Sequence, residues 1–93
     1  MAIEINDIKV RVRELTPVNE NGRRSVTFET TDYPSQVIGD FELWGADAEH
    51  CPYAQGDVGV LSLYLYRRQR QSGTSYYMAV RIGGFVHESR MEP

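Results

Sequence analysis

Apolar and polar side chains alternate along most of the chain, and this pattern predicts strands rather than helices. A period of two residues places successive side chains on opposite faces of a strand, so that one face can be buried. In the first such segment, aliphatic side chains alternate with the basic side chains of Lys9, Arg11 and Arg13. Five segments share the pattern: residues 8–14, 24–30, 36–45, 58–68 and 75–85.

Turn and helix signals separate these strands. Residues 21–22 and 72–73 both end in glycine, which is typical of the tight turns that join antiparallel strands. In the third strand, Val37, Phe41 and Leu43 are expected on one face, and Gly39 predicts a bulge or bend. Residues 46–57 are the only place for a helix, and Pro52 limits that helix to one or two turns.

Five strands with one short helix between the third and the fourth follow the order of an OB-fold. We therefore predict an all-β fold, a five-stranded OB-fold Greek-key barrel with one short helix; an SH3-like barrel is the main alternative. At 93 residues, a single domain is expected to cover residues 1–93. Its core is expected at about 7–86, with flexible ends at 1–6 and 87–93.

The composition is that of an ordinary soluble domain, with 41% apolar and 25% charged residues. No apolar run is long enough to span a membrane, and the first residues do not form a secretory leader. The single cysteine, Cys51, has no partner for an internal disulfide, which fits a reducing compartment. We expect a cytoplasmic protein without a membrane partner.

Charge is segregated along the chain, although the net charge is only −3. Residues 32–57 contain six acidic residues and no Lys or Arg, whereas residues 58–87 contain four arginines and no acidic residue. Local potential steers partners more than the total charge does, so an anionic ligand remains compatible with the chain.

The turn between the fourth and fifth strands concentrates aromatic and cationic side chains. Proteins that bind single-stranded nucleic acid combine cationic grooves with aromatic faces, and each stacked base contributes ~1–3 kcal/mol. The candidate residues of this hairpin are Tyr64, Tyr66, Arg67, Arg68, Arg70, Tyr77 and Arg81. The alternative is an ordinary solvated hairpin, because tyrosine is common on half-exposed strands and arginine keeps a long hairpin soluble.

Two other regions are candidates for the same site. In an OB barrel the first loop approaches the groove beside the last one, so Arg23 and Arg24 are expected to join the hairpin arginines in one cleft. Trp44 ends the third strand, either as a stacking platform or as part of the core, and its phase relative to Phe41 and Leu43 favours exposure. The basic residues of the first strand are interpreted as a solvated strand face.

No pattern supports catalysis or a bound metal. His50 and Cys51 are adjacent, but with the distant His87 they do not have the spacing of a zinc site. The chain contains no glycine-rich phosphate loop followed by a helix, and no signature of a serine hydrolase. We expect no enzymatic activity and no cofactor.

A longer pattern, spread over residues 28–57, resembles that of a known protein family. It consists of a strand ending in Glu-Thr, a nearby Tyr-Pro, a strand ending in Trp-Gly and a Gly-Asp that opens the fourth strand. The matching residues are Phe28, Glu29, Thr30, Tyr33, Pro34, Phe41, Trp44, Gly45, Gly56 and Asp57. In these residues the chain resembles a family of small uncharacterised bacterial OB-fold proteins that are similar to single-stranded-DNA-binding proteins. The resemblance implies an OB-fold and nucleic-acid binding.

The chain departs from that family in its charges. Asp40 and Glu42 make the third strand acidic, and an OB-fold usually carries nucleic acid across its second and third strands. Acidic groups on this track repel a phosphate backbone unless they point away from it.

These patterns predict a non-catalytic module that binds single-stranded DNA or RNA with little sequence preference. Binding is expected to weaken with salt, because phosphate contacts release counterions. The alternative is a protein-interaction or self-association module, in which the acidic segment and the basic hairpin pair between copies or with a protein partner.

Overall fold

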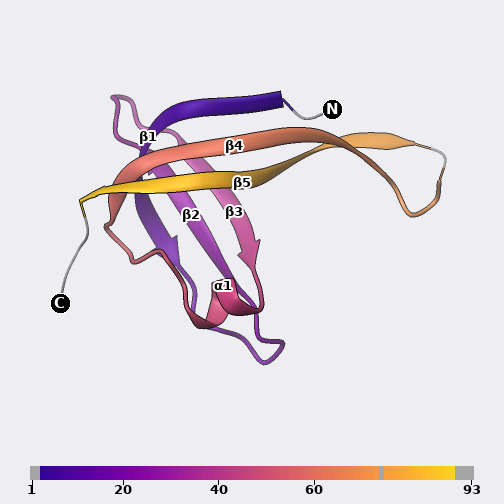
Figure 1. The fold of residues 1–93 in the computed structure, drawn as a ribbon, viewed down its shortest axis with the longest axis horizontal. Coiled ribbons are helices and arrows are strands. Elements are labelled where there is room, and N and C mark those ends of the chain that lie inside the picture. Colours follow the sequence, from indigo (N-terminus) through magenta and orange to yellow (C-terminus); the bar gives the residue numbers. More distant parts are fainter. Residues whose placement is uncertain (1–2, 74, 90–93) are drawn as a thin grey trace.

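The computed structural model describes residues 3–73 and 75–89, which form five strands and one short helix (Figure 1). The elements are β1 (Ile3–Leu15), β2 (Arg24–Thr30), β3 (Val37–Leu43), α1 (Ala46–Glu49), β4 (Val58–Gln69) and β5 (Tyr76–Ser89). The prediction of an all-β fold with a helix between the third and fourth strands is confirmed.

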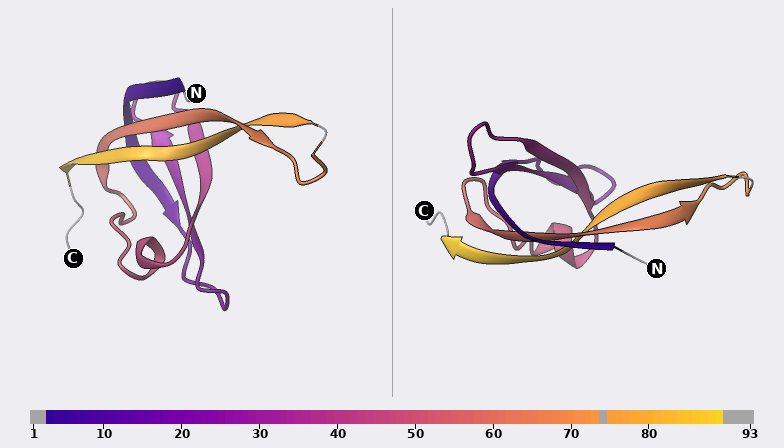
Figure 2. Two further views of the ribbon diagram at one scale, coloured as in Figure 1. Left: turned by 45° about the vertical axis from the view of Figure 1, so that its right-hand side comes forward. Right: turned by 90° about the horizontal axis from the view of Figure 1, so that it is seen from above.

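The five strands form one antiparallel sheet in the order β3-β2-β1-β4-β5. The long β1 pairs with β4 through its first part and with β2 through its second part, and the sheet coils on itself (Figure 2). No ladder joins β3 to β5 in the described part of the chain. The sheet is therefore open between its two edge strands.

The core is centred on Phe28 of β2, which is fully buried. Its ring centre lies 6.0 Å from that of Phe41, 5.6 Å from that of Tyr53 and 5.7 Å from that of Phe85. The other buried apolar residues are Val10, Val12, Val26, Leu43, Ala48, Leu61 and Leu63. Aromatic packing around Phe28 thus holds β3 and β5 near each other although their backbones do not pair.

A bulge in β3 changes which of its side chains face the core. The pairing of β2 with β3 shifts at Gly39 and Asp40, so the predicted bend at Gly39 is confirmed. An extra residue reverses the alternation of a strand. Ile38 consequently packs against the core and Val37 is 56% exposed, which makes the prediction that Val37 shares the buried face of Phe41 wrong.

The β4–β5 hairpin projects beyond the body of the molecule (Figures 1 and 2). Within the body, Leu61 and Leu63 of β4 are buried. Farther along the hairpin, Tyr76, Met78 and Val80 of β5 are exposed, because the other described residues do not extend fully over them.

The strands extend farther toward both ends of the chain than the pattern predicted. Residues 3–6 belong to β1 and residues 87–89 to β5, where flexible ends were expected. Residues 1–2 and 90–93, on which the rest of that expectation falls, lie outside the described residues.

A buried polar contact fixes the end of β5. The His87 Nε2 and Asp57 Oδ2 atoms are 3.0 Å apart, and their side chains are 14% and 4% exposed. The same carboxylate oxygen accepts a hydrogen bond from the backbone N–H of Ala54 at 3.0 Å. Asp57 therefore joins the turn before β4 to the last strand.

Replacing Asp57 by alanine is expected to lower the free energy of unfolding by about 1–3 kcal/mol, because partners in the interior lose their acceptor. Urea denaturation measures this change. The control is Asp32→Ala, since Asp32 is exposed and a surface substitution changes stability by about 0.5 kcal/mol or less. A loss for Asp57→Ala no larger than for the control would contradict the role given to Asp57.

Candidate nucleic-acid interface

The register of the β4–β5 hairpin places tyrosine and arginine side chains on one face. Tyr64 lies opposite Arg81, and Arg68 lies opposite Tyr77. Directly opposed residues of an antiparallel ladder share a face, as do residues two positions apart on one strand. We call this surface the Tyr/Arg face; its members are Tyr64, Tyr66, Arg68, Tyr77 and Arg81 of the paired strands, together with Arg70 at the turn, which contacts the Tyr77 ring.

Arginine side chains lie over the tyrosine rings of this face. The Arg81 Cζ atom is 5.2 Å from the centre of the Tyr64 ring and 5.8 Å from that of Tyr66. The Arg70 Cζ atom is 4.9 Å from the centre of the Tyr77 ring. A cation–π contact at an exposed site contributes ~0.5–1 kcal/mol, so these contacts orient the guanidinium groups without consuming their N–H donors.

Two of the predicted residues are less accessible from the Tyr/Arg face. Arg67 lies opposite Met78 on the other face, where its Cζ atom is 4.2 Å from the centre of the Tyr76 ring. Tyr64 is half-buried and covers Gly83, at which a Cβ atom would come within 2.7 Å of the tyrosine ring. The predicted cluster is thus divided between two faces.

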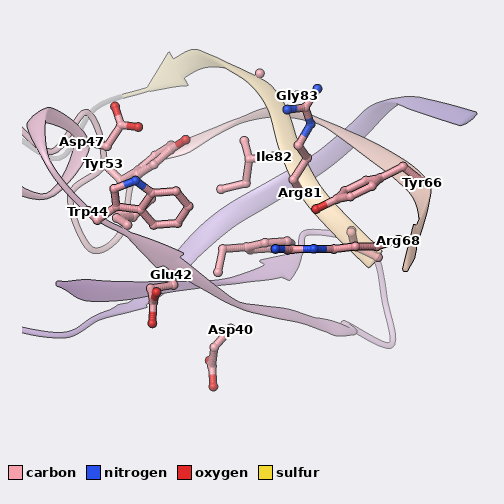
Figure 3. A pocket seen from close by; sticks show the side chains of 14 residues that line it. Asp40, Glu42, Trp44, Asp47, Tyr53, Tyr66, Arg68, Arg81, Ile82 and Gly83 are labelled. Atoms are coloured by element: carbon pink, nitrogen blue, oxygen red, sulfur yellow. The ribbon is translucent and has the colours of Figure 1, made fainter. Parts of the chain in front are cut away.

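The Tyr/Arg face continues into a groove of about 560 Å³ between β3 and β5. Trp44, at the end of β3, lies on one side of it, and Tyr66, Arg68 and Arg81 come from the hairpin on the other (Figure 3). The Trp44 side chain is 64% exposed, in agreement with the exposure that its phase favours. The groove therefore has aromatic side chains on both sides and two arginines on one.

Three carboxylates line the β3 side of the groove; we call Asp40, Glu42 and Asp47 the acidic wall. Asp40 and Glu42 point away from the aromatic side chains (Figure 3). Asp40 accepts a hydrogen bond from the Thr27 hydroxyl, and Glu42 pairs with Arg23 at 2.9 Å. The two acidic residues that conflict with a phosphate track are thus directed away from it and have partners.

Tyr53 contributes a neutral polar group to the same groove. Burial raises the pKa of its hydroxyl above the usual value, and the charge of Asp47 raises it further. The phenol is protonated at neutral pH and can donate a hydrogen bond.

Arg23 and Arg24 do not join the hairpin arginines in one cleft, which corrects the prediction. Arg23 is occupied by its ion pair with Glu42, and Arg24 Nε donates a hydrogen bond to the backbone carbonyl of Thr16 at 2.9 Å. Both line a separate, smaller pocket at the β1–β2 loop, and this loop lies away from the hairpin turn (Figure 2).

Sequence reasoning missed Tyr53 and Asp47 as residues of the groove. Both belong to the segment around α1, whose position relative to β5 depends on packing around Phe28. The resemblance matched residues on either side of this segment, which is the one signal that pointed near it.

No group of three or more His, Cys, Asp or Glu side chains that could hold a metal ion occurs in the described part of the chain. Within residues 3–73 and 75–89, no helix has the length and apolar character needed to cross a bilayer. Comparison of the chain with known protein families, with curated proteins and with solved structures finds no match.

Proposed function

We propose that this chain is a non-catalytic module that binds single-stranded nucleic acid in the groove between β3 and β5. The observation that carries the proposal is the joint position of Trp44, Tyr66, Arg68 and Arg81 around one open groove. Binding of a single strand by aromatic stacking and phosphate pairing requires this combination of side chains.

The strand order supports an OB-type fold as part of the proposal. A sheet ordered β3-β2-β1-β4-β5, with a helix between β3 and β4, has the connectivity of an OB barrel opened between β3 and β5. The resemblance to small bacterial OB-fold proteins agrees with this interpretation. In such a barrel the open seam coincides with the proposed groove.

In the proposed complex, phosphates lie along the hairpin side of the groove and pair with Arg68 and Arg81. Bases stack on Trp44 and Tyr66, whose faces accept any base. Asp40 and Glu42 point away from the aromatic side chains and have partners, so they do not oppose phosphates on the arginine side. In the proposed complex the backbone therefore follows the arginines and the bases lie toward Trp44.

Replacing Trp44 by alanine is expected to weaken binding of a single-stranded oligonucleotide about tenfold, because one stacked base contributes ~1–3 kcal/mol. Tyr66→Ala is expected to have a similar effect. Isothermal titration calorimetry with a short oligothymidylate measures both.

The matched control is Val86→Ala, since Val86 is 70% exposed on β5 but does not line the groove. Circular dichroism should show that all three variants keep the fold. Unchanged affinity in both aromatic variants would exclude the groove as the binding site. An equal loss of affinity in Val86→Ala would indicate that the substitutions act by disturbing the fold rather than by removing contacts in the groove.

A further inference from the structure

One end of the groove between β3 and β5 carries polar groups that the proposed phosphate contacts do not use. Trp44, Asp47 and Tyr53 lie together there, at the end of β3 and in the segment around α1 (Figure 3). The arginines of the groove, Arg68 and Arg81, come from the hairpin on its other side. A base that stacks on Trp44 therefore lies beside a carboxylate and a phenol.

Asp47 differs from the other two members of the acidic wall. Asp40 accepts a hydrogen bond from the Thr27 hydroxyl. Glu42 pairs with Arg23. In the part of the chain that the structure describes, the Asp47 carboxylate has no hydrogen-bond or ion-pair partner, and the residue is exposed. Both of its oxygens can therefore accept hydrogen bonds from a ligand in the groove.

Tyr53 places a hydrogen-bond donor close to Asp47. Burial raises the pKa of the Tyr53 hydroxyl, and the charge of Asp47 raises it further, because the two side chains are near each other. Edge contacts hold the Tyr53 ring, whose centre lies 5.6 Å from that of Phe28 and 5.4 Å from that of Phe85. Among the described residues, the hydroxyl has no hydrogen-bond partner. The two side chains thus present two acceptor oxygens and one positioned donor.

We propose that Asp47 and Tyr53 give the groove a preference for guanine at the position that stacks on Trp44. This inference rests on the proposed function, since it concerns a base held in that groove. Guanine carries two adjacent N–H donors, at N1 and at the amino group on C2, next to the acceptor O6. The Asp47 carboxylate accepts hydrogen bonds from both donors, and the Tyr53 hydroxyl donates to O6. Elsewhere along the strand, stacking accepts any base.

The other common bases match this arrangement less well. Thymine and uracil have one ring N–H donor between two acceptors, so one carboxylate oxygen stays unpaired. Adenine and cytosine have an amino group beside a ring nitrogen that is itself an acceptor, and this nitrogen would face a carboxylate oxygen. A site built around hydrogen bonds discriminates against ligands that leave its polar groups unpaired.

Fluorescence anisotropy with short labelled oligothymidylates tests the preference, with one central base changed to guanine, adenine or hypoxanthine. We expect the guanine strand to bind the wild-type chain at least about tenfold more tightly than the adenine strand, since one hydrogen bond to a charged group corresponds to about that factor. Hypoxanthine lacks the amino group on C2, so its strand is expected to have an intermediate affinity.

The ratio of the guanine-strand affinity to the adenine-strand affinity is the measured quantity, because removing a negative charge raises the affinity of every strand. Asp47→Asn is expected to lower this ratio about tenfold. Tyr53→Phe keeps the ring contacts and is expected to lower the ratio by a smaller factor, since it removes one hydrogen bond between neutral groups.

Glu49→Gln is the matched control for Asp47→Asn. It removes the same charge from an exposed residue of α1 that does not line the groove, so the ratio is expected to stay as in the wild type. Circular dichroism verifies that every variant is folded.

Binding of the oligothymidylate without a preference for the guanine strand would overturn this inference and leave the groove as the nucleic-acid site. An equal fall of the ratio in Asp47→Asn and in Glu49→Gln would overturn it too, as would an unchanged ratio in Asp47→Asn. If no strand binds, the proposed function fails, and the guanine preference fails with it.

Discussion

Replacing Arg68 and Arg81 together by alanine is expected to weaken binding of a single-stranded oligonucleotide on the order of a hundredfold. A hydrogen bond to a charged group contributes ~1.5–3 kcal/mol, and each 1.4 kcal/mol corresponds to a factor of about ten in affinity. Both arginines are on the hairpin side of the groove, where the phosphates are proposed to lie. The loss exceeds that expected for either aromatic residue, because two charged contacts disappear at once.

The salt dependence of binding by the same variant shows whether Arg68 and Arg81 contact phosphates directly or only contribute to the overall positive charge of the protein. For a single strand, the slope of log affinity against log salt becomes less steep by ~0.7 for each phosphate contact that is lost. The slope of the double variant should therefore be less steep than that of the wild type by ~1.4. Lys9→Ala with Arg13→Ala removes the same charge from β1, whose basic residues do not line the groove. If this control weakened binding as much as the hairpin variant, the groove would have no special role.

Replacing Phe28 by alanine is expected to lower the free energy of unfolding by about 3–5 kcal/mol, which is the usual cost of removing a buried phenylalanine ring. Three aromatic rings surround Phe28 within 6.0 Å between ring centres. A small domain has only about 5–15 kcal/mol of stability in total, so this variant is expected to be partly unfolded at room temperature.

Thermal and urea unfolding followed by circular dichroism measure the effect of Phe28→Ala. Val18→Ala is the surface control, since Val18 is 47% exposed in the β1–β2 loop. A loss of stability below about 1 kcal/mol would show that the packing around Phe28 does not hold β3 and β5 together.

The strands and the helix could be predicted from the sequence because their signals are local. Alternation of apolar and polar residues identified all five strands, and Gly39 identified the bulge in β3. Phe41 and Leu43, after the bulge, face the core as predicted. Val37, before the bulge, is exposed, because one extra residue reverses the alternation between the two parts of the strand and the pattern did not take this into account.

The open seam and the projecting hairpin depend on how far strands extend past their neighbours. Met78 and Val80 share a face with the leucines of β4. The sequence could not show that these two residues lie beyond the body, where Met78 is 57% and Val80 47% exposed.

The candidate site was predicted for residues of one hairpin and for Trp44. Tyr66, Arg68 and Arg81 were named as candidates and line one groove, and the phase of Trp44 favoured its exposure. The ion pair between Arg23 and Glu42 joins residues that are far apart in sequence, and no local pattern predicts it. That contact both removes Arg23 from the site and gives the acidic strand a counter-charge.

The proposed function is tested most directly by fluorescence anisotropy of labelled single-stranded DNA and RNA oligonucleotides, with a duplex for comparison, at low and near-physiological salt. We predict micromolar or tighter binding of single strands at low salt, weaker binding of the duplex, and a clear loss of affinity as salt increases. No binding of any single strand at low salt would contradict the proposal that the groove between β3 and β5 holds nucleic acid.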